Sequence, residues 1–177
     1  MAKKADTAAL AFGVGQSVVY PAHGVGKITS VEKQTVAGME LEVYVVAFDQ
    51  DKMILRVPTN RAEASGMRAL AGSKLVEDAL KTLGGRARVK RTMWSRRAQE
   101  YEAKINSGDL ISIAEVVRDL HRGDDQPEQS YSERQLYESA LDRMARELAA
   151  VESIDKSTAM EKLAKGLAAK KKVAAAA

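Results

Sequence analysis

Hydrophobic residues in the first third of the chain fall in short runs that alternate with polar positions, a period typical of β-strands. The runs are rich in β-branched and aromatic residues, and turn-forming proline, glycine or aspartate follows each of them. No segment with a helical period separates them. The pattern predicts an antiparallel β unit of four strands, at residues 17–20, 25–36, 41–48 and 53–58.

After residue 58 the hydrophobic period becomes that of amphipathic helices, with apolar residues three and four positions apart. Five helical stripes follow, and the last one is expected to be short. Side chains that accept a hydrogen bond from a free backbone N–H mark helix starts. The second helix is expected to begin near Trp94, and the predicted caps of the others are Ser73, Asp109 or Ser112, Ser132 in a capping box with Gln135, and Thr158 with Glu161.

The two patterns predict an α+β protein in two domains, a small antiparallel β barrel followed by an all-α domain. The expected divisions are a disordered N-terminus at 1–11, the barrel at 12–64, the helical domain at 65–165 and a mobile Lys- and Ala-rich tail at 166–177. A barrel of this size buries only about 60% of its unfolded surface, so it is marginally stable alone.

The composition limits the chemistry that the chain can perform. Its 177 residues include no cysteine and only two histidines, which excludes thiolate sites and leaves little material for a histidine metal site. No serine, histidine and aspartate set stands out, so we expect a protein that is not an enzyme and has no metal or cofactor. No apolar run approaches the ~20 residues of a membrane span, and the N-terminus lacks the apolar stretch of a signal peptide. A cytoplasmic monomer is expected.

Charge is distributed unevenly along the chain. Residues 1–66 carry seven basic and seven acidic side chains, residues 67–104 carry ten and four, and residues 105–155 carry five and twelve. The acidic residues of the last block are expected on solvated helix faces. Surfaces that differ in charge suit different partners, and only the basic centre is expected to bind nucleic acid.

The basic centre is concentrated at residues 86–97, where six cations and no acid surround the chain's one tryptophan, Trp94. Trp94 shares a helical register with Ala98, Tyr101 and Ile105, so one interpretation places it in the helical core. In the other, the cations bind a phosphate backbone while the aromatic ring stacks on bases or wedges between them. A single tryptophan cannot read several bases, so contacts to backbone and shape are expected.

The strand at 53–58 offers a second candidate surface. Strand alternation places its odd-numbered residues on one face and Ile54 and Arg56 on the other. If the odd-numbered set is core, Ile54 and Arg56 lie exposed beside each other. An exposed arginine is often only solvated, but an exposed Ile–Arg pair is also typical of a protein-binding surface, where arginine is enriched.

Several stretches of the sequence are similar to one known family. They are Phe12-Gly-Val-Gly-Gln-Ser-Val-Val-Tyr-Pro-Ala-His-Gly-Val-Gly, Leu55-Arg-Val-Pro58, Trp94-Ser-Arg-Arg97, and Ser107-Gly-Asp109 followed by Ile113-Ala-Glu-Val-Val-Arg-Asp-Leu120. Together they resemble the CarD/CdnL family of bacterial transcription regulators. The first two are shared with the RNA polymerase-interacting domain of transcription-repair coupling factors, and the last two are particular to the CarD/CdnL type.

The resemblance implies a Tudor-like barrel that binds the protrusion of the RNA polymerase β subunit, and a helical domain that reaches the upstream edge of the transcription bubble. There the family's tryptophan enters the minor groove as a wedge and keeps the bubble from re-closing. On this resemblance Arg56 contacts the polymerase with Ile54 beside it. Gln34 stands where some relatives carry a second polymerase-contacting arginine, and Gln99 where some carry a DNA-facing lysine. The implied DNA-binding residues are Trp94, Arg96 and Arg97, with Arg91, Lys90 and Arg88 as neighbouring cations.

The sequence therefore predicts an RNA polymerase accessory factor that stabilises open promoter complexes. The alternative is a free-standing single-strand nucleic-acid binding protein that uses the basic centre and needs no polymerase. The end of the chain, Val173-Ala-Ala-Ala-Ala177, also resembles the small apolar C-termini that Clp-type proteases recognise, although a passive tail is the simpler interpretation.

Overall fold

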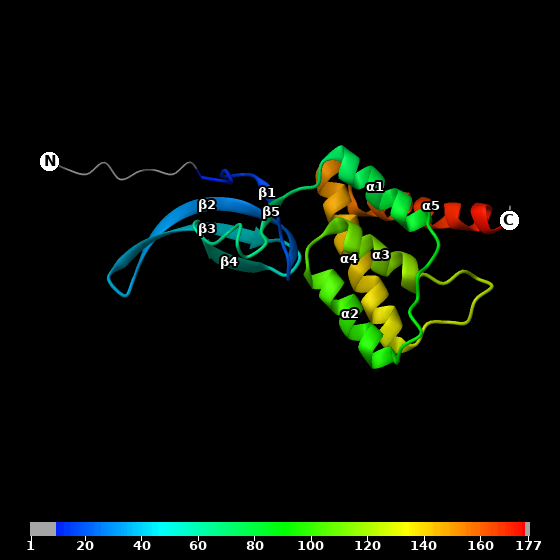
Figure 1. Cartoon of the computed structure of the whole chain (residues 1–177). Coiled ribbons are helices and arrows are strands. Elements are labelled where there is room, and N and C mark those ends of the chain that lie inside the picture. Colours follow the sequence, from blue (N-terminus) through cyan, green and yellow to red (C-terminus); the bar gives the residue numbers. More distant parts are fainter. Residues whose placement is uncertain (1–9, 176–177) are drawn as a thin grey trace.

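The computed structural model describes residues 10–175, in which five strands precede five helices (Figure 1). The predicted order, a small antiparallel β domain and then a helical domain, is confirmed. No helix within this range is long and apolar enough to cross a membrane. The strands are β1 (Ser17–Tyr20), β2 (Gly24–Val36), β3 (Met39–Phe48), β4 (Met53–Pro58) and β5 (Arg68–Ala69), and the helices are α1 (Ser73–Gly84), α2 (Trp94–Asn106), α3 (Leu110–Leu120), α4 (Tyr131–Glu152) and α5 (Lys156–Ala175).

The sheet is antiparallel, with strand order β4-β3-β2-β1-β5. Strands β4 and β5 are its two edges, so the sheet is open, and this arrangement is consistent with the predicted Tudor-like β domain. The sequence pattern did not predict β5, because two residues are too few to show a period. Since β5 pairs with Val18 and Val19 of β1, the β domain extends beyond the predicted boundary at residue 64.

One face of the sheet carries the core of the first domain. Tyr44 and Phe48 of β3 and Ile28 of β2 are almost fully buried. The backbone N–H of Phe12 donates to the Tyr44 hydroxyl at 3.3 Å, which fixes the segment before β1 to the sheet. Gly26 leaves the space that this packing needs, because a β-carbon there would lie 2.7 Å from the Phe48 ring.

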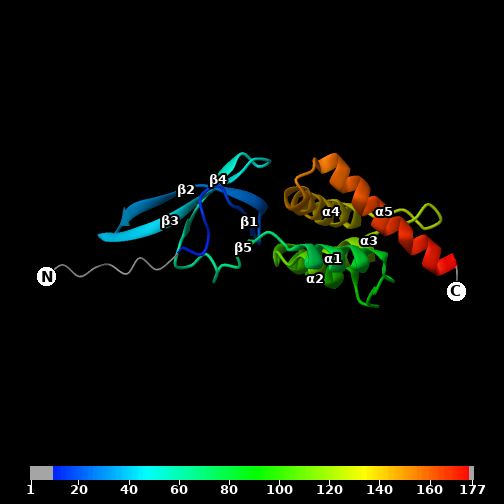
Figure 2. The ribbon, with the colours of Figure 1, turned by 90° about the horizontal axis from the view of Figure 1, so that it is seen from above.

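Strands β2 and β3 form a long hairpin that extends away from the helical domain (Figures 1 and 2). Its turn has positive φ at both Ala37 (52°) and Gly38 (76°), a combination typical of two-residue hairpin loops. Val36 and Met39 pair across this turn and are 53% and 66% exposed. The tip therefore presents two apolar side chains away from either core.

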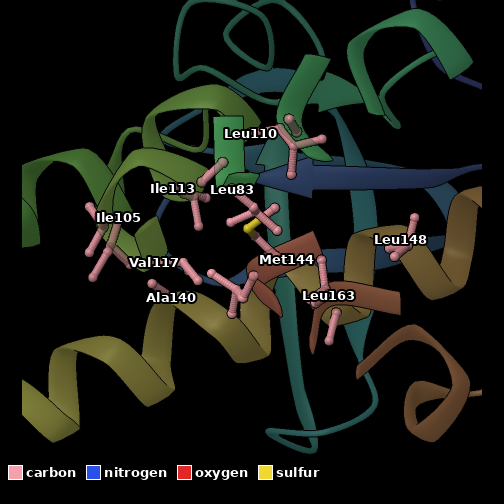
Figure 3. Packing of buried hydrophobic residues seen from close by; sticks show 14 of the residues in the cluster. Leu83, Ile105, Leu110, Ile113, Val117, Ala140, Met144, Leu148 and Leu163 are labelled. Carbon is pink, nitrogen blue, oxygen red and sulfur yellow. The ribbon is translucent and has the colours of Figure 1, made fainter. Parts of the chain in front are cut away.

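The helical domain is built around α3, whose Ala114, Val116 and Val117 are fully buried. Helices α1, α2 and α4 contact α3, and α5 contacts α1 and α4. Figure 3 shows how side chains from these helices meet in one cluster. The labelled residues are Leu83, Ile105, Leu110, Ile113, Val117, Ala140, Met144, Leu148 and Leu163.

The start of α4 differs from the prediction by two residues. The Ser130 side chain accepts from the Glu133 N–H at 3.3 Å, and the Glu133 carboxylate accepts from the Ser130 N–H at 2.9 Å. These two residues form the capping box, so the predicted box of Ser132 and Gln135 is wrong. Both pairs fit the spacing of the motif, which accepts glutamate or glutamine at the third helical position. Only the hydrogen bonds of the folded backbone decide between them.

The other predicted caps have mixed outcomes. Asp109, one of two candidates, caps α3 by accepting from the Ser112 N–H at 3.1 Å. The prediction of Ser73 as a cap is wrong, because Gly72 holds that position and Ser73 is the first helical residue. At α5 the cap is not Thr158 itself, because the Asp155 carboxylate accepts from the Thr158 N–H at 3.1 Å.

Helix α5 is longer than the short helix expected from the sequence. It runs from Lys156 to Ala175, and Leu163 and Leu167 are both buried. The predicted start of the tail at residue 166 therefore lies inside α5, because alanine and lysine favour a helix and Leu167 continues its apolar stripe. Most of the predicted disordered N-terminus, residues 1–9, lies outside the described residues.

Arg143 of α4 joins the helical domain to the sheet domain. Its guanidinium donates to the carbonyl oxygens of Pro21 (2.8 Å) and Ala22 (2.7 Å) in the β1–β2 turn, and of Ile105 (3.0 Å) in α2. Burial lowers the pKa of Arg143, but a guanidinium stays protonated at any physiological pH. One cation thus holds carbonyl groups of both domains.

Arg68 of β5 makes a second connection. It donates to the carbonyl oxygen of Gly108 at 3.1 and 2.6 Å, and to the two carboxylate oxygens of Glu147 at 2.6 and 3.0 Å. The Glu147 carboxylate also accepts from the Ala71 N–H at 3.1 Å. With 3% of its surface exposed, Glu147 contradicts the expectation that the acidic residues of 105–155 are solvated. It fixes the segment between the domains onto α4.

Candidate interaction surfaces

Strand β4 presents the first candidate surface, at an edge of the sheet. Val57 is buried, whereas Ile54 is 59% exposed and the Arg56 side chain is 53% exposed. The side chains of β4 therefore alternate between the core face and the outward face in the order predicted from the sequence. An apolar side chain and a cation lie two residues apart on the outward face.

The third residue predicted for this surface, Gln34, lies on β2, separated from β4 by β3. Glu32, two positions earlier on β2, has its carboxylate 3.9 Å from Nε of Arg56. Because residues two apart on a strand share a face, Gln34 lies on the same outward face as Arg56. The ion pair is exposed, and such pairs contribute only about 0–1 kcal/mol, so Arg56 can exchange Glu32 for another acceptor.

The basic segment, residues 86–97, links α1 to the first turn of α2. Its irregular part is anchored to α3, because the backbone N–H of Arg88 donates to the buried carboxylate of Asp119 at 2.9 Å. The same Asp119 oxygen accepts from Nε of Arg118 at 2.9 Å. The side chains of Arg86, Arg88, Lys90 and Arg91 remain exposed on a backbone that α3 holds in place.

The cations of the basic segment are not equivalent. Lys90 Nζ lies 2.9 Å from the Glu100 carboxylate, and this hydrogen bond is the main reason that the pKa of Glu100 is lowered. Arg96 is exposed on the first turn of α2. Arg97 is partly buried, and its guanidinium lies 5.4 Å from the centre of the Trp94 ring. Arg97 therefore faces the protein, and Arg96 faces solvent.

Trp94 is the first residue of α2 and lies at the rim of the helical core. It is partly buried, and its ring centre is 6.4 Å from that of Tyr101. The indole N–H donates to the Ser132 hydroxyl at the start of α4, at 3.0 Å. The two interpretations of Trp94 are thus not exclusive, because one part of the ring packs on the core while another part remains exposed.

Two residues at this surface were not found by sequence reasoning. Ser132 was assigned to a helix cap but instead binds the indole, a contact between residues 38 apart in the chain. Met93, the N-cap residue of α2, is 78% exposed. A methionine beside Trp94 in a polar segment was a signal available in the sequence, but hydrophobic periodicity alone does not distinguish it from a core residue.

A cleft of about 440 Å³ lies at the other side of the helical domain, between the loop that follows α3 and helices α4 and α5. The His121 ring and the Tyr137 hydroxyl meet there at 3.0 Å, and burial raises the pKa of the Tyr137 phenol. Within residues 10–175 no group of three or more His, Cys, Asp or Glu side chains could hold a metal ion.

The structure thus joins an open β sheet with an exposed Ile–Arg edge to a helical domain with a basic segment that carries a tryptophan. Residues 12–71 match the CarD-like/TRCF RID domain, and residues 78–164 match the CarD C-terminal domain. The chain belongs to the CarD family of RNA polymerase-binding transcription regulators.

The chain is also similar to a bacterial protein over most of its length. The chain is 25% identical over 143 residues to the candidate transcription factor YdeB of Bacillus subtilis strain 168. The aligned region covers 81% of this chain and 94% of that protein. Both domains are therefore represented in the relative. The shared class is one of transcription factors, and the function of this chain is transcription regulation linked to RNA polymerase.

Proposed function

We propose that the outward face of β4 binds the β subunit of RNA polymerase at its protrusion, and that the basic segment contacts the minor groove at the upstream edge of the transcription bubble. The protein thereby stabilises the open promoter complex. The observation that carries this proposal is the presence of two exposed surfaces of different chemistry on two joined domains. One is the Ile54–Arg56 edge, and the other is the basic segment with Trp94.

The start of α2 supports the contact with DNA. Met93 occupies the N-cap position and has no side-chain group that accepts a hydrogen bond from the first turn. The positive end of the helix dipole at this turn therefore favours a phosphate. Arg91 and Arg96 are exposed on either side of it in the sequence. Contacts of this kind position a protein on DNA without reading bases.

The mechanism is one of linkage. A ligand that binds the open complex better than the closed complex shifts the equilibrium by the difference in affinity. An aromatic side chain stacked on a base contributes about 1–3 kcal/mol, which corresponds to about 5- to 150-fold. Binding to the polymerase raises the local concentration of the helical domain, so weak affinity for DNA is sufficient.

The test is the lifetime of open complexes on a linear promoter fragment, measured with the full chain. The wild type is expected to lengthen the lifetime. Arg56→Glu is expected to abolish both the effect and binding to polymerase, because it reverses the charge at the proposed contact. Glu32→Ala is the control, since it removes the ion pair and leaves the cation. Unchanged binding by Arg56→Glu would show that this face is not the polymerase contact.

The alternative function is polymerase-independent binding of single strands, which the basic segment alone favours. It predicts gel shifts of single-stranded DNA or RNA that are the same with and without polymerase, and that Arg56→Glu does not alter. Binding to duplex promoter DNA only when polymerase is present supports the accessory factor instead.

Recognition of the C-terminus by a Clp-type protease stays a prediction, because Ala176 and Ala177 lie outside the described residues. The change Ala176-Ala177→Asp-Asp is expected to lengthen the lifetime of the protein in cells, since a charged end replaces a small apolar one. The melting temperature should not change. Equal half-lives of the two proteins after translation is blocked would contradict the prediction.

A further inference from the structure

The most exposed apolar side chain of the basic segment belongs to Met93 and not to Trp94. Met93 is 78% exposed, and Val89, the other exposed apolar residue of the segment, is 43% exposed. Trp94 is partly buried at the rim of the helical core. Nothing in the packing of the domain requires a large apolar group at position 93, so its exposure needs another explanation.

Trp94 is held by the protein in three ways. Its indole N–H donates to Ser132 at 3.0 Å, the Arg97 guanidinium lies 5.4 Å from the ring centre, and Tyr101 lies 6.4 Å from it on the inner side. A ring restrained in this manner can present an edge to DNA. To enter the groove completely, it would have to give up these contacts.

Met93 has a fixed backbone and an unrestrained apolar side chain. Its carbonyl oxygen accepts from the N–H groups of Arg96 and Arg97, both at 3.1 Å, which holds the residue at the start of α2. The side chain is unbranched and deformable, and methionine is one of the residues that architectural proteins insert between base steps. The surrounding cations would hold the phosphates on either side.

On this basis, and resting on the function proposed above, we propose that Met93 leads the insertion into the minor groove at the edge of the bubble. Trp94 lies behind it and supports it with the part of its ring that faces solvent. Two adjacent apolar groups, one mobile and one anchored, then separate the base step. This assigns to Met93 a direct contact with DNA.

The experiment compares Met93→Ala and Met93→Leu in the full chain, with Met39→Ala as a matched control. Neither alanine nor leucine can cap α2, so these changes alter only the apolar side chain at position 93. Met39 is 66% exposed at the tip of the β2–β3 hairpin, in the other domain and outside the basic segment. Met93→Ala is expected to reduce the lengthening of open-complex lifetime several-fold, while Met93→Leu and Met39→Ala retain it. Polymerase binding, melting temperature and the salt dependence of DNA binding should not change.

The outcomes distinguish this inference from the proposed function. If the wild type does not lengthen the lifetime, the proposed function is wrong. If the wild type does so and Met93→Ala is equally active, the function stands and the role of Met93 is wrong. Equal loss in Met93→Leu and Met93→Ala would also overturn it, because leucine keeps the apolar volume.

A photo-crosslinking residue provides a second readout that does not depend on activity. Placed at position 93 in the complex with polymerase and promoter, it is expected to label nucleotides at the upstream edge of the bubble. At position 39 it is expected to label none of them. The absence of labelling from position 93, with labelling from position 96, would place the DNA beside Met93 and not on it, and would overturn the inference.

Discussion

Individual side chains at the start of α2 have both buried and exposed parts, and the sequence indicated each part separately. The helical register grouped Trp94 with Tyr101 and Ile105, and these two are buried. The surrounding cations indicated an exposed position, and Trp94 is indeed only partly buried. The contact with Ser132 could not be predicted, because it depends on how α2 packs against α4.

The change Trp94→Ala is the first prediction at this scale. For a fully buried tryptophan, this change lowers the free energy of unfolding by about 3–5 kcal/mol. Because Trp94 is partly buried, we expect about half of that in urea unfolding, together with a shorter open-complex lifetime and unchanged polymerase binding. Glu102→Ala, a change of an exposed residue on the same helix and outside the basic segment, serves as the control. Wild-type stability combined with a wild-type lifetime would exclude both roles of Trp94.

Arg96 and Arg97 give the second prediction, since they are adjacent in sequence but differ in environment. Arg96→Ala is expected to lower the slope of log binding constant against log salt by about 0.9, the effect of one lost phosphate contact. Arg97→Ala should change the slope less and lower stability more, because its guanidinium covers the Trp94 ring and its Nε is buried. The measurement is DNA binding at several salt concentrations. A larger change of slope in Arg97→Ala than in Arg96→Ala, together with a larger loss of stability in Arg96→Ala, would contradict the structure.

At the scale of elements, the hydrophobic period located long segments well and their ends less well. The bounds of β1 and β4 and the first residues of α2 and α3 agree with the sequence. The ends depend on local hydrogen bonds that several residues can make. In Ser130-Tyr-Ser-Glu-Arg-Gln135 two overlapping pairs have capping-box spacing, and only the backbone decides that Ser130 and Glu133 form the box.

This overlap gives a prediction for the start of α4. Ser130→Ala should destabilise the helical domain by about 0.5–2 kcal/mol, the usual effect of losing a cap. Ser132→Ala should leave the cap intact and remove the partner of the indole N–H. Because the chain has one tryptophan, its fluorescence reports the second change specifically. A shift in emission with Ser130→Ala and none with Ser132→Ala would reverse the assignment.

At the scale of the whole molecule, the two domains are joined mainly by charged side chains that bind backbone carbonyls. Arg68 and Arg143 reach Gly108, Pro21 and Ala22. The sequence could not show this, because a charged residue whose partner lies far away in the chain cannot be told from a charged residue that faces solvent. The proposed function, in which the protein bridges polymerase and DNA, requires a defined spacing between its two surfaces. These contacts hold the two domains together.

The role of this interface is tested with Arg143→Ala, because Arg143 binds carbonyl groups of both domains. Arg146→Ala is the matched control: it lies on the same helix and pairs with Asp142 within α4. We expect Arg143→Ala to lower the free energy of unfolding by about 1.5–3 kcal/mol, the range for hydrogen bonds to a charged group.

Arg143→Ala should also allow the domains to move relative to each other, which small-angle scattering would detect as a broader distance distribution. Binding to polymerase should remain, since the β4 face is in the sheet domain and does not include Arg143. The lifetime of the open complex should fall, because the basic segment is no longer held at a fixed distance from the polymerase. If Arg143→Ala and Arg146→Ala both scatter and act like the wild type, the spacing of the two surfaces does not depend on this arginine.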